Sequence, residues 1–363
     1  MNLTIYILNG KKHSKAELLE LADNKIIDKQ IPQWEKDVFQ FILEWFNNSN
    51  SIIAQTSGST GTPKEISLPK VKMAKSASMT AEYFSLHTGS KVALLLPANY
   101  IAGKMMIVRA LVNQWDLYLG NPKGNVLEQL PEIEFDFTAM VPLQAENTLE
   151  NPAHWKKIKK CILGGAPVSD TLKKELQKLP TTFYESYGMT ETMSHVAIKN
   201  ISKNQACFEA ISGMKFMQDD RNCLKIVAPD LLDKPLQSND IVDLKDEKHF
   251  RWLGRFDNVI NSGGVKLMPE QIEAKLKTHI PYEFFISSEP DKKLGEKVIL
   301  IVEANKANLR KIKFDSIFEQ YLDSYEKPKT IYNLAKFKRS DSGKFLRKKC
   351  IKKIGIEGKV YIK

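Results

Sequence analysis

The sequence predicts an α/β fold with two domains, and three patterns support this. Short apolar runs alternate with helical segments from residue 51 to 184, which is the signature of a mostly parallel sheet. Two later stretches instead alternate as β ribbons do, at 211–228 and 240–253. From Pro269 onward, helices and strands form a compact α+β pattern. We therefore expect a large N-terminal domain over 1–255 and a small C-terminal domain over 256–363.

The individual elements follow from hydrophobic spacing and from capping signals. Ser14 and Glu17 form a capping box at the start of the first helix. The expected helices span 17–22, 34–46, 70–84, 104–112, 169–179, 270–277 and 314–324. The expected strands are short apolar runs at 3–8, 51–54, 66–68, 91–96, 115–119, 137–141, 160–163, 182–184, 284–287 and 297–303. Ligands of parallel sheets bind beyond the carboxyl ends of the strands, so the loops at 58–61, 164–165 and 187–192 are expected to share one site.

Composition excludes several classes of protein. A hydrophobic content of 42% over 363 residues supports real cores and argues against global disorder. No apolar run is long enough for a transmembrane helix, and the N-terminus lacks the features of a secretory signal, so we expect a cytoplasmic protein without membrane insertion. The four cysteines and six histidines form no metal-binding spacing, so we expect neither a disulfide framework nor a zinc site.

The net charge of +11 requires a nucleic-acid partner to be considered. The lysines of the protein are spread along the chain, as on a solvated surface, and no RNA-binding signature, zinc finger or basic zipper is visible. We therefore expect no nucleic-acid partner. A basic surface also suits polyanionic small molecules such as ATP and coenzyme A.

A hydroxyl- and glycine-rich loop at residues 55–64 has the composition of a phosphate cradle. Its members are Thr56, Ser57, Gly58, Ser59, Thr60, Gly61, Thr62 and Lys64. Glycines let the backbone approach a ligand closely, free N–H groups and hydroxyls form a nest for an anion, and the lysine adds a positive charge. The loop is not a Walker A motif, which needs Gly-Lys-Ser/Thr. A Ser/Gly run is more often a flexible linker, but this one follows a short apolar strand, which favours the cradle for a nucleotide triphosphate.

A second segment crowds hydroxyl, carboxylate and aromatic groups around a glycine, as Tyr184-Glu-Ser-Tyr-Gly-Met-Thr-Glu-Thr192. A carboxylate beside a phosphate site requires a bridging cation, and oxygen ligands with phosphates hold Mg²⁺, so Glu191 is the candidate metal ligand. Thr190 could bond a phosphate, and Tyr187, before Gly188, could stack on a purine. Alone, this segment could be a polar turn; its order after the first loop argues against that.

Both segments closely resemble the motifs of the adenylate-forming superfamily of AMP-binding enzymes and acyl-CoA synthetases. Weaker matches follow in the same order. Asp240 resembles the ribose-binding aspartate, although the usual Tyr-x-Thr-Gly lead-in is reduced here. Arg255 resembles the ribose-contacting arginine, Asp257 the hinge of a mobile C-terminal domain, and Lys344 the catalytic lysine. The resemblance covers roughly 51–350; the N-terminal region before the phosphate loop is shorter than usual for the family, which affects the expected walls of the acyl pocket.

Within the superfamily, the segment 186–197 is similar to that of o-succinylbenzoate–CoA ligases of menaquinone biosynthesis. The Gly164-Gly165-Ala166 loop and the segment around Tyr100 are similar too, although the subfamily usually has His in place of that tyrosine. The second carboxylate of such a substrate needs donors near the pocket. Ser194 and His195 lie on the expected acyl side, with Tyr100 and the 164–166 backbone as walls for the ring; a histidine with no role beyond packing is the alternative reading for His195.

The resemblance implies a two-step acid–thiol ligase. In the first step the substrate carboxylate attacks the α-phosphate of ATP, while Glu191 holds Mg²⁺ and Lys344 bridges the reacting groups. The C-terminal domain then swings about Asp257 and brings Gly263 and Gly264 to the site. In the second step the thiol of coenzyme A displaces AMP. The alternatives are a different aryl- or acyl-CoA ligase, an enzyme that loads a carrier protein, or a nucleotide-binding module without catalysis. The sequence leaves the oligomeric state open.

Overall fold

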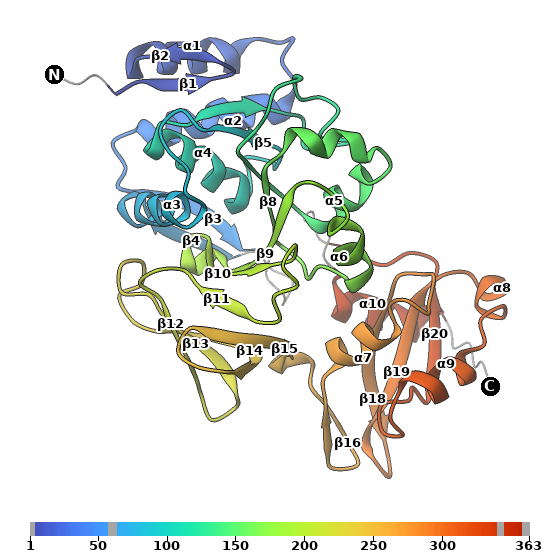
Figure 1. The fold of residues 1–363 in the computed structure, drawn as a ribbon. Coiled ribbons are helices and arrows are strands. Elements are labelled where there is room, and N and C mark those ends of the chain that lie inside the picture. The colour runs from blue at the N-terminus through green and yellow to red at the C-terminus, as the bar shows by residue number, and fades with distance from the viewer. Residues whose placement is uncertain (1–3, 57–63, 340–344, 358–363) are drawn as a thin grey trace.

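The computed structural model describes residues 4–56, 64–339 and 345–357 (Figure 1). Most of the expected phosphate cradle, from Ser57 to Thr62, lies outside these ranges, as does the expected catalytic Lys344. For Thr56 and Lys64 only the backbone is described.

A parallel sheet forms the centre of the N-terminal part. Its strands run in the order β9 (Thr182–Gly188), β8 (Lys160–Leu163), β7 (Phe137–Met140), β5 (Lys91–Leu94), β6 (Asp116–Leu119) and β1 (Tyr6–Leu8). Alternate side chains of β5 point to opposite cores: Val92 and Leu94 pack on one face, Ala93 on the other. The first face is covered by α2 (Gln33–Phe46), α3 (Lys70–Phe84) and α4 (Ile101–Asn113), the second by α5 (Pro142–Thr148) and α6 (Asp170–Leu176) (Figure 1).

The same sheet continues beyond β9 with antiparallel strands. These are β10 (His195–Asn200), β11 (Phe208–Ala210), β15 (His249–Arg255), β14 (Leu236–Leu244), β13 (Cys223–Val227) and β12 (Lys215–Gln218). At the other edge β2 (Lys11–His13) pairs with β1, beside α1 (Lys15–Ile27), whose capping box at Ser14 is confirmed. The hairpin of β3 (Ser51–Thr56) and β4 (Lys64–Pro69) forms a separate two-stranded sheet. The expectation that the parallel sheet starts at residue 51 is therefore wrong: this hairpin is outside it, whereas β1 belongs to it.

A second, five-stranded sheet holds the C-terminal part. It contains β16 (Ile260–Ser262), β17 (Val265–Leu267), β18 (Phe284–Asp291), β19 (Gly295–Glu303) and β20 (Thr330–Leu334). One face packs on α7 (Pro269–Leu276), α8 (Lys306–Leu309) and α9 (Phe314–Tyr321), and the other on α10 (Arg347–Glu357). The chain changes sheets between Arg255 and Ile260, and the division into two domains at this point stays a prediction.

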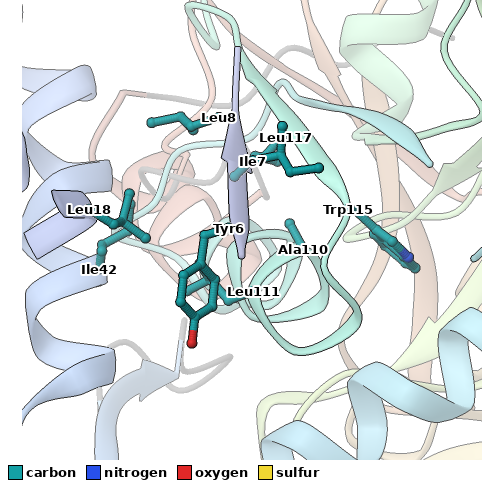
Figure 2. A pocket seen from close by; sticks show the side chains of 9 residues that line it. All are labelled: Tyr6, Ile7, Leu8, Leu18, Ile42, Ala110, Leu111, Trp115 and Leu117. Atoms are coloured by element: carbon teal, nitrogen blue, oxygen red, sulfur yellow. The ribbon is translucent and has the colours of Figure 1, made fainter. Parts of the chain in front are cut away.

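The N-terminal strand β1 is sealed against α1, α2, α4 and β6 by apolar side chains. Figure 2 shows the cavity that remains there, lined by residues such as Tyr6, Leu18 and Trp115. Its volume is about 10 Å³. Ligand pockets have volumes of roughly 300–1,000 Å³, so this cavity is a packing defect and the functional site lies elsewhere. Within the ranges that the structure describes, no helix is long and apolar enough to cross a membrane.

The mixed α/β fold and the β ribbons expected from the sequence are confirmed. The helix predicted at 70–84 and the strand predicted at 160–163 have those bounds in the structure. The predicted strand at 182–184 is longer, since β9 extends to Gly188 and carries Tyr187. The sequence analysis missed several short elements: β2, β10, β11, β16, β17, β20, α5, α8 and α10.

Candidate active site

The loop that follows β8 is held at both ends by side chains of the neighbouring strand β9. Leu163 and Glu185 are paired in the parallel register, so the loop leaves the sheet beside Ser186. The Ser186 hydroxyl donates to the Leu163 carbonyl at 3.0 Å, and the Val168 N–H donates to Glu185 Oε1 at 3.1 Å. Glu185 is buried and pairs with Lys199 at 2.7 Å. The loop with Gly164, Gly165 and Ala166 is therefore fixed at the carboxyl ends of the parallel strands, where a ligand is expected.

Gly188 allows β9 and β10 to approach each other closely. A Cβ atom there would lie 2.4 Å from the Ser194 carbonyl oxygen and 2.5 Å from His195 Cα. Any other residue would overlap with the backbone of β10. The turn between the strands, with the 3-10 helix η2 (Thr190–Thr192), is closed by the Thr192 hydroxyl, which donates to the Ser194 carbonyl at 2.7 Å.

The turn places η2, which contains Glu191, against the hairpin on either side of the expected phosphate cradle, because η2 contacts both β3 and β4. The Glu191 side chain is partly buried, and among the described residues it has no hydrogen-bond or ion-pair partner. Within the same part of the chain, no three acidic, histidine or cysteine side chains group as metal ligands. A single carboxylate fits Mg²⁺, which proteins commonly hold by one or two carboxylates together with substrate phosphates. Thr190 adjoins Glu191, so both could serve the roles expected from the sequence.

A buried carboxylate, Asp240, lies at the junction of β9, β14 and β15. The antiparallel register pairs it with Arg255, whose Nη1 lies 3.5 Å from Oδ1. Trp252 Nε1 also donates to Oδ1, at 3.1 Å, and the Tyr187 hydroxyl donates to Oδ2 at 2.7 Å. Burial, and then the Asp240 charge, raise the pKa of Tyr187 well above its ordinary value, so the phenol stays a donor. The structure thus brings together three residues predicted to contact the nucleoside: Tyr187, Asp240 and Arg255.

Tyr187 has a packing role that the sequence analysis did not foresee. Its ring meets Phe250 edge-on at 5.1 Å between centroids and lies 5.9 Å from Phe208. These contacts fix the ring from one side. Stacking of adenine on Tyr187 stays a prediction.

The expected hinge, Asp257, lies in η3 (Phe256–Asn258) between the two sheets. It pairs with Arg255 at 2.9 Å and accepts from Asn239 Nδ2 at 3.3 Å. Gly263 and Gly264, at positive φ of 58° and 83°, form the two-residue turn between β16 and β17. Both positions of a type I′ turn need positive φ, so the hairpin alone explains these glycines, and their role toward coenzyme A stays a prediction.

A buried arginine that the sequence analysis missed lies beside Ser194 and His195. Arg109, on α4, is 2% exposed; its Nη2 donates to the Ser194 hydroxyl and lies 3.3 Å from His195 Nδ1. Its Nε donates to the Thr80 hydroxyl at 3.2 Å. Among the described residues no carboxylate lies within 4.0 Å of the guanidinium, and burial lowers the pKa of Arg109 to about 9. A signal was present in the sequence: Arg109 is the one charged residue in the apolar run from Met105 to Val112.

His195 is neutral in this network. Burial, and then the Arg109 charge, hold its pKa well below the ordinary value. Nδ1 faces the donor Arg109, so Nε2 carries the proton toward the Thr80 hydroxyl at 3.3 Å, and that hydroxyl donates to the Ser76 carbonyl at 3.0 Å. The neutral imidazole thus accepts a hydrogen bond from Arg109 through Nδ1 and adds no second positive charge beside it. Tyr100, the other residue expected at the acyl pocket, is the N-cap of α4 and precedes Arg109 on the same helix.

Comparison with known proteins places this fold and site in one class. Residues 11–220 match the family model of AMP-binding enzymes, which is more than half of the chain. The chain therefore belongs to the AMP-binding enzyme family.

Individual relatives are more specific. The chain is 23% identical over 320 residues to the 2-succinylbenzoate–CoA ligase of Lactococcus lactis, covering 82% of this chain and 70% of that one. It is 26% identical over 289 residues to the Haemophilus influenzae enzyme of the same name, covering 75% and 63%.

Solved structures agree with the family assignment. An acyl-CoA synthetase (AMP-forming)/AMP-acid ligase II-like protein of Dyadobacter fermentans is 34% identical, with a TM-score of 0.59 over 92% of this chain and 97% of that one. The o-succinylbenzoate CoA synthetase of Bacillus subtilis, in complex with its acyl-adenylate intermediate, is 16% identical, with a TM-score of 0.80 over 99% and 96% of the two chains. The second comparison bears on the fold alone.

The neutral His195 predicts a loss of stability in acid. In the unfolded chain His195 has its ordinary pKa of 6.5, so below that pH the unfolded state binds a proton that the native state does not. Stability should therefore fall as the pH falls below 6.5, by about 1.4 kcal/mol per pH unit for this group. Urea unfolding at pH 7 and pH 5 should show a smaller acid loss in His195→Gln than in the wild type. The exposed His87→Gln serves as the control, and an unchanged acid loss in His195→Gln would contradict the assignment.

Proposed function

We propose that the protein is an ATP-dependent acid–CoA ligase that activates o-succinylbenzoate as an acyl-adenylate and transfers it to coenzyme A, as in menaquinone biosynthesis. Membership of the AMP-binding family supports the adenylation chemistry. Relatives in Lactococcus and Haemophilus that are named 2-succinylbenzoate–CoA ligase support the substrate. The match spans 63% of the Haemophilus enzyme, so the activity of the whole enzyme is carried over here as a proposal.

The observation that carries the choice of substrate is the buried guanidinium of Arg109. A buried charge without a partner costs several kcal/mol, because its hydration is lost and nothing of opposite charge replaces it. A substrate with a second carboxylate would supply the missing charge and form charge-assisted hydrogen bonds with Arg109 and Ser194. A monocarboxylic acid would leave Arg109 without any carboxylate partner among the residues that the structure describes. This argument favours o-succinylbenzoate over the other aryl and acyl acids that the family could accept.

The reaction would proceed in two steps at the strand ends. The carboxylate to be activated attacks the α-phosphate of ATP, forming the mixed anhydride and releasing pyrophosphate. The hydroxyls and N–H groups of 56–62 and the Lys64 ammonium would hold the phosphates, while Asp240 and Arg255 would hold the ribose. Lys344 would neutralise charge that develops between the substrate carboxylate and the α-phosphate. The thiol of coenzyme A then attacks the anhydride carbonyl and expels AMP.

Two further elements of the proposal come from the site and the family. Mg²⁺ would be held by Glu191 and the phosphates and would offset their negative charge. Coenzyme A would reach the anhydride after the C-terminal part turns about Asp257. This turn would bring Gly263 and Gly264 to the side of the site where coenzyme A binds. We propose the cytoplasm as the location, in keeping with these soluble substrates.

Replacing Arg109 with methionine should remove the preference for the second carboxylate. The informative pair of substrates is o-succinylbenzoate and 4-oxo-4-phenylbutanoate, which lacks only the carboxylate on the ring. A hydrogen bond to a charged group contributes about 1.5–3 kcal/mol, so Arg109→Met should lower kcat/KM for o-succinylbenzoate roughly 10- to 100-fold. For 4-oxo-4-phenylbutanoate, the kcat/KM of Arg109→Met should be nearly the same as that of the wild type with the same analogue.

The exposed Arg251→Met is the matched control for this experiment. The KM for ATP should change less than about twofold in either variant, because Arg109 is proposed to bind the acid and not the nucleotide. A loss of the same factor for both acids would show that Arg109 has only a structural role.

Replacing Lys344 with alanine should separate the two half-reactions. Acid-dependent pyrophosphate release should be abolished, since the charge that stabilises the first transition state is gone, whereas thioester formation from supplied acyl-adenylate should stay near the wild-type rate. The control is Lys348→Ala, an exposed lysine of α10. Equal loss in both half-reactions would contradict the role assigned to Lys344.

A further inference from the structure

We infer that Trp252 is a positioning residue for nucleotide binding, because its indole N–H fixes the Asp240 carboxylate in the orientation that receives the ribose hydroxyls. The inference rests on the proposed function in one respect, namely that Asp240 faces the ribose of ATP. Trp252 belongs to none of the motifs that the sequence analysis singled out.

A β-bulge aims Trp252 at Asp240. The register pairs Asp240 with Arg255 and Ile241 with Gly254, but it then pairs Val242 with Trp252, so Leu253 is an extra residue in β15. Residues two apart on a strand point to the same face. In a regular ladder Leu253 would lie opposite Val242, on the face that carries Asp240; the bulge puts Trp252 there instead. Bulges next to active sites commonly redirect a side chain in this way.

The donors around Asp240 are divided between its two oxygens. Trp252 Nε1 donates to Oδ1 at 3.1 Å, and the Tyr187 hydroxyl donates to Oδ2 at 2.7 Å. The Asp240 N–H is bonded to the Ser238 hydroxyl at 3.1 Å, which fixes the backbone as well. An ionised carboxylate has about four acceptor positions, so one donor on each oxygen orients the group and leaves room for two more. Two adjacent hydroxyls, as on a ribose, are donors with that spacing.

Arg255 cannot replace the tryptophan. Its guanidinium lies 3.5 Å from Asp240 Oδ1 but only 2.9 Å from Asp257, so its closer partner is the expected hinge. Without the indole N–H, the nearest donor to Oδ1 among the described residues would be the Arg255 guanidinium, which also pairs with the Asp257 carboxylate. Asp240 is only 6% exposed, so the orientation of its carboxylate depends on these few donors.

Binding of ATP, 2′-deoxyATP and 3′-deoxyATP by the full chain tests this inference. Calorimetric titrations with Mg²⁺ would compare the wild type with Trp252→Phe, which keeps an aromatic ring and removes the donor. The wild type should bind ATP about tenfold more tightly than at least one deoxynucleotide. Trp252→Phe should lose about tenfold for ATP and less than about twofold for that deoxynucleotide, so that the preference disappears.

Two controls keep the test independent of folding and of catalysis. Tyr187→Phe removes the other donor and should weaken the same preference, while Trp45→Phe, on α2, should leave it unchanged. An equal loss for ATP and the deoxynucleotides in Trp252→Phe, or no loss at all, would overturn the inference. Equal binding of all three nucleotides by the wild type would also overturn it. A wild type that prefers ATP but releases no pyrophosphate with any acid would overturn the proposed function alone.

Discussion

The reversal of the chain between β9 and β10 is the constraint on which the rest of the site depends. The strands from β1 through β6, β5, β7 and β8 to β9 pair in parallel, and from β10 onward the pairing is antiparallel. Gly188 permits this reversal, since no side chain fits between it and the backbone of His195. Three features follow from the same close approach: η2, which contains Glu191, contacts the β3–β4 hairpin, Ser194 and His195 face α4, and Tyr187 reaches Asp240.

Two buried charges lie on either side of this reversal, and their environments differ in a way that suits their proposed roles. Asp240 has one neutral donor on each oxygen and the Arg255 guanidinium near Oδ1, so its orientation is fixed before any ligand arrives. Arg109 has hydroxyl and imidazole neighbours but, among the described residues, no carboxylate. The first arrangement would orient the carboxylate that is proposed to bind the nucleoside, and the second would leave a charge for the proposed substrate to neutralise. Such a site would select a dicarboxylate at one end and a ribonucleotide at the other.

Much of the fold and part of the site could be predicted from the sequence, because they depend on local patterns. The helix at 70–84 and the strand at 160–163 are fixed by apolar spacing and by the prolines and polar residues around them. The segment with Tyr187 and Glu191 is recognisable because its residue types are contiguous in the chain. Asp240 and Arg255 were identified separately, and the structure pairs them across two strands.

The remaining parts depend on long-range register, which no local pattern encodes. Strand β10 was missed because it is buried on nearly every side and has no alternation to mark it. In the sequence Arg109 is only a single charge in an apolar helix. Its contacts with Ser194 and His195, which lie more than eighty residues away in the chain, are formed by the fold. The contact between Trp252 and Asp240 cannot be predicted without the bulge between β14 and β15, because this single extra residue changes which side chain faces Asp240.

The most direct test of this account is pyrophosphate and AMP release by the wild-type protein with a panel of acids, with and without coenzyme A. The panel should contain o-succinylbenzoate, benzoate, coumarate and short fatty acids. The account predicts that o-succinylbenzoate gives acid-dependent pyrophosphate release that exceeds that of every monocarboxylic acid, and that AMP and the thioester accumulate only when coenzyme A is added. Turnover of monocarboxylic acids with none of o-succinylbenzoate would contradict the role of Arg109, and the absence of acid-dependent pyrophosphate release with every acid would contradict the adenylation chemistry itself.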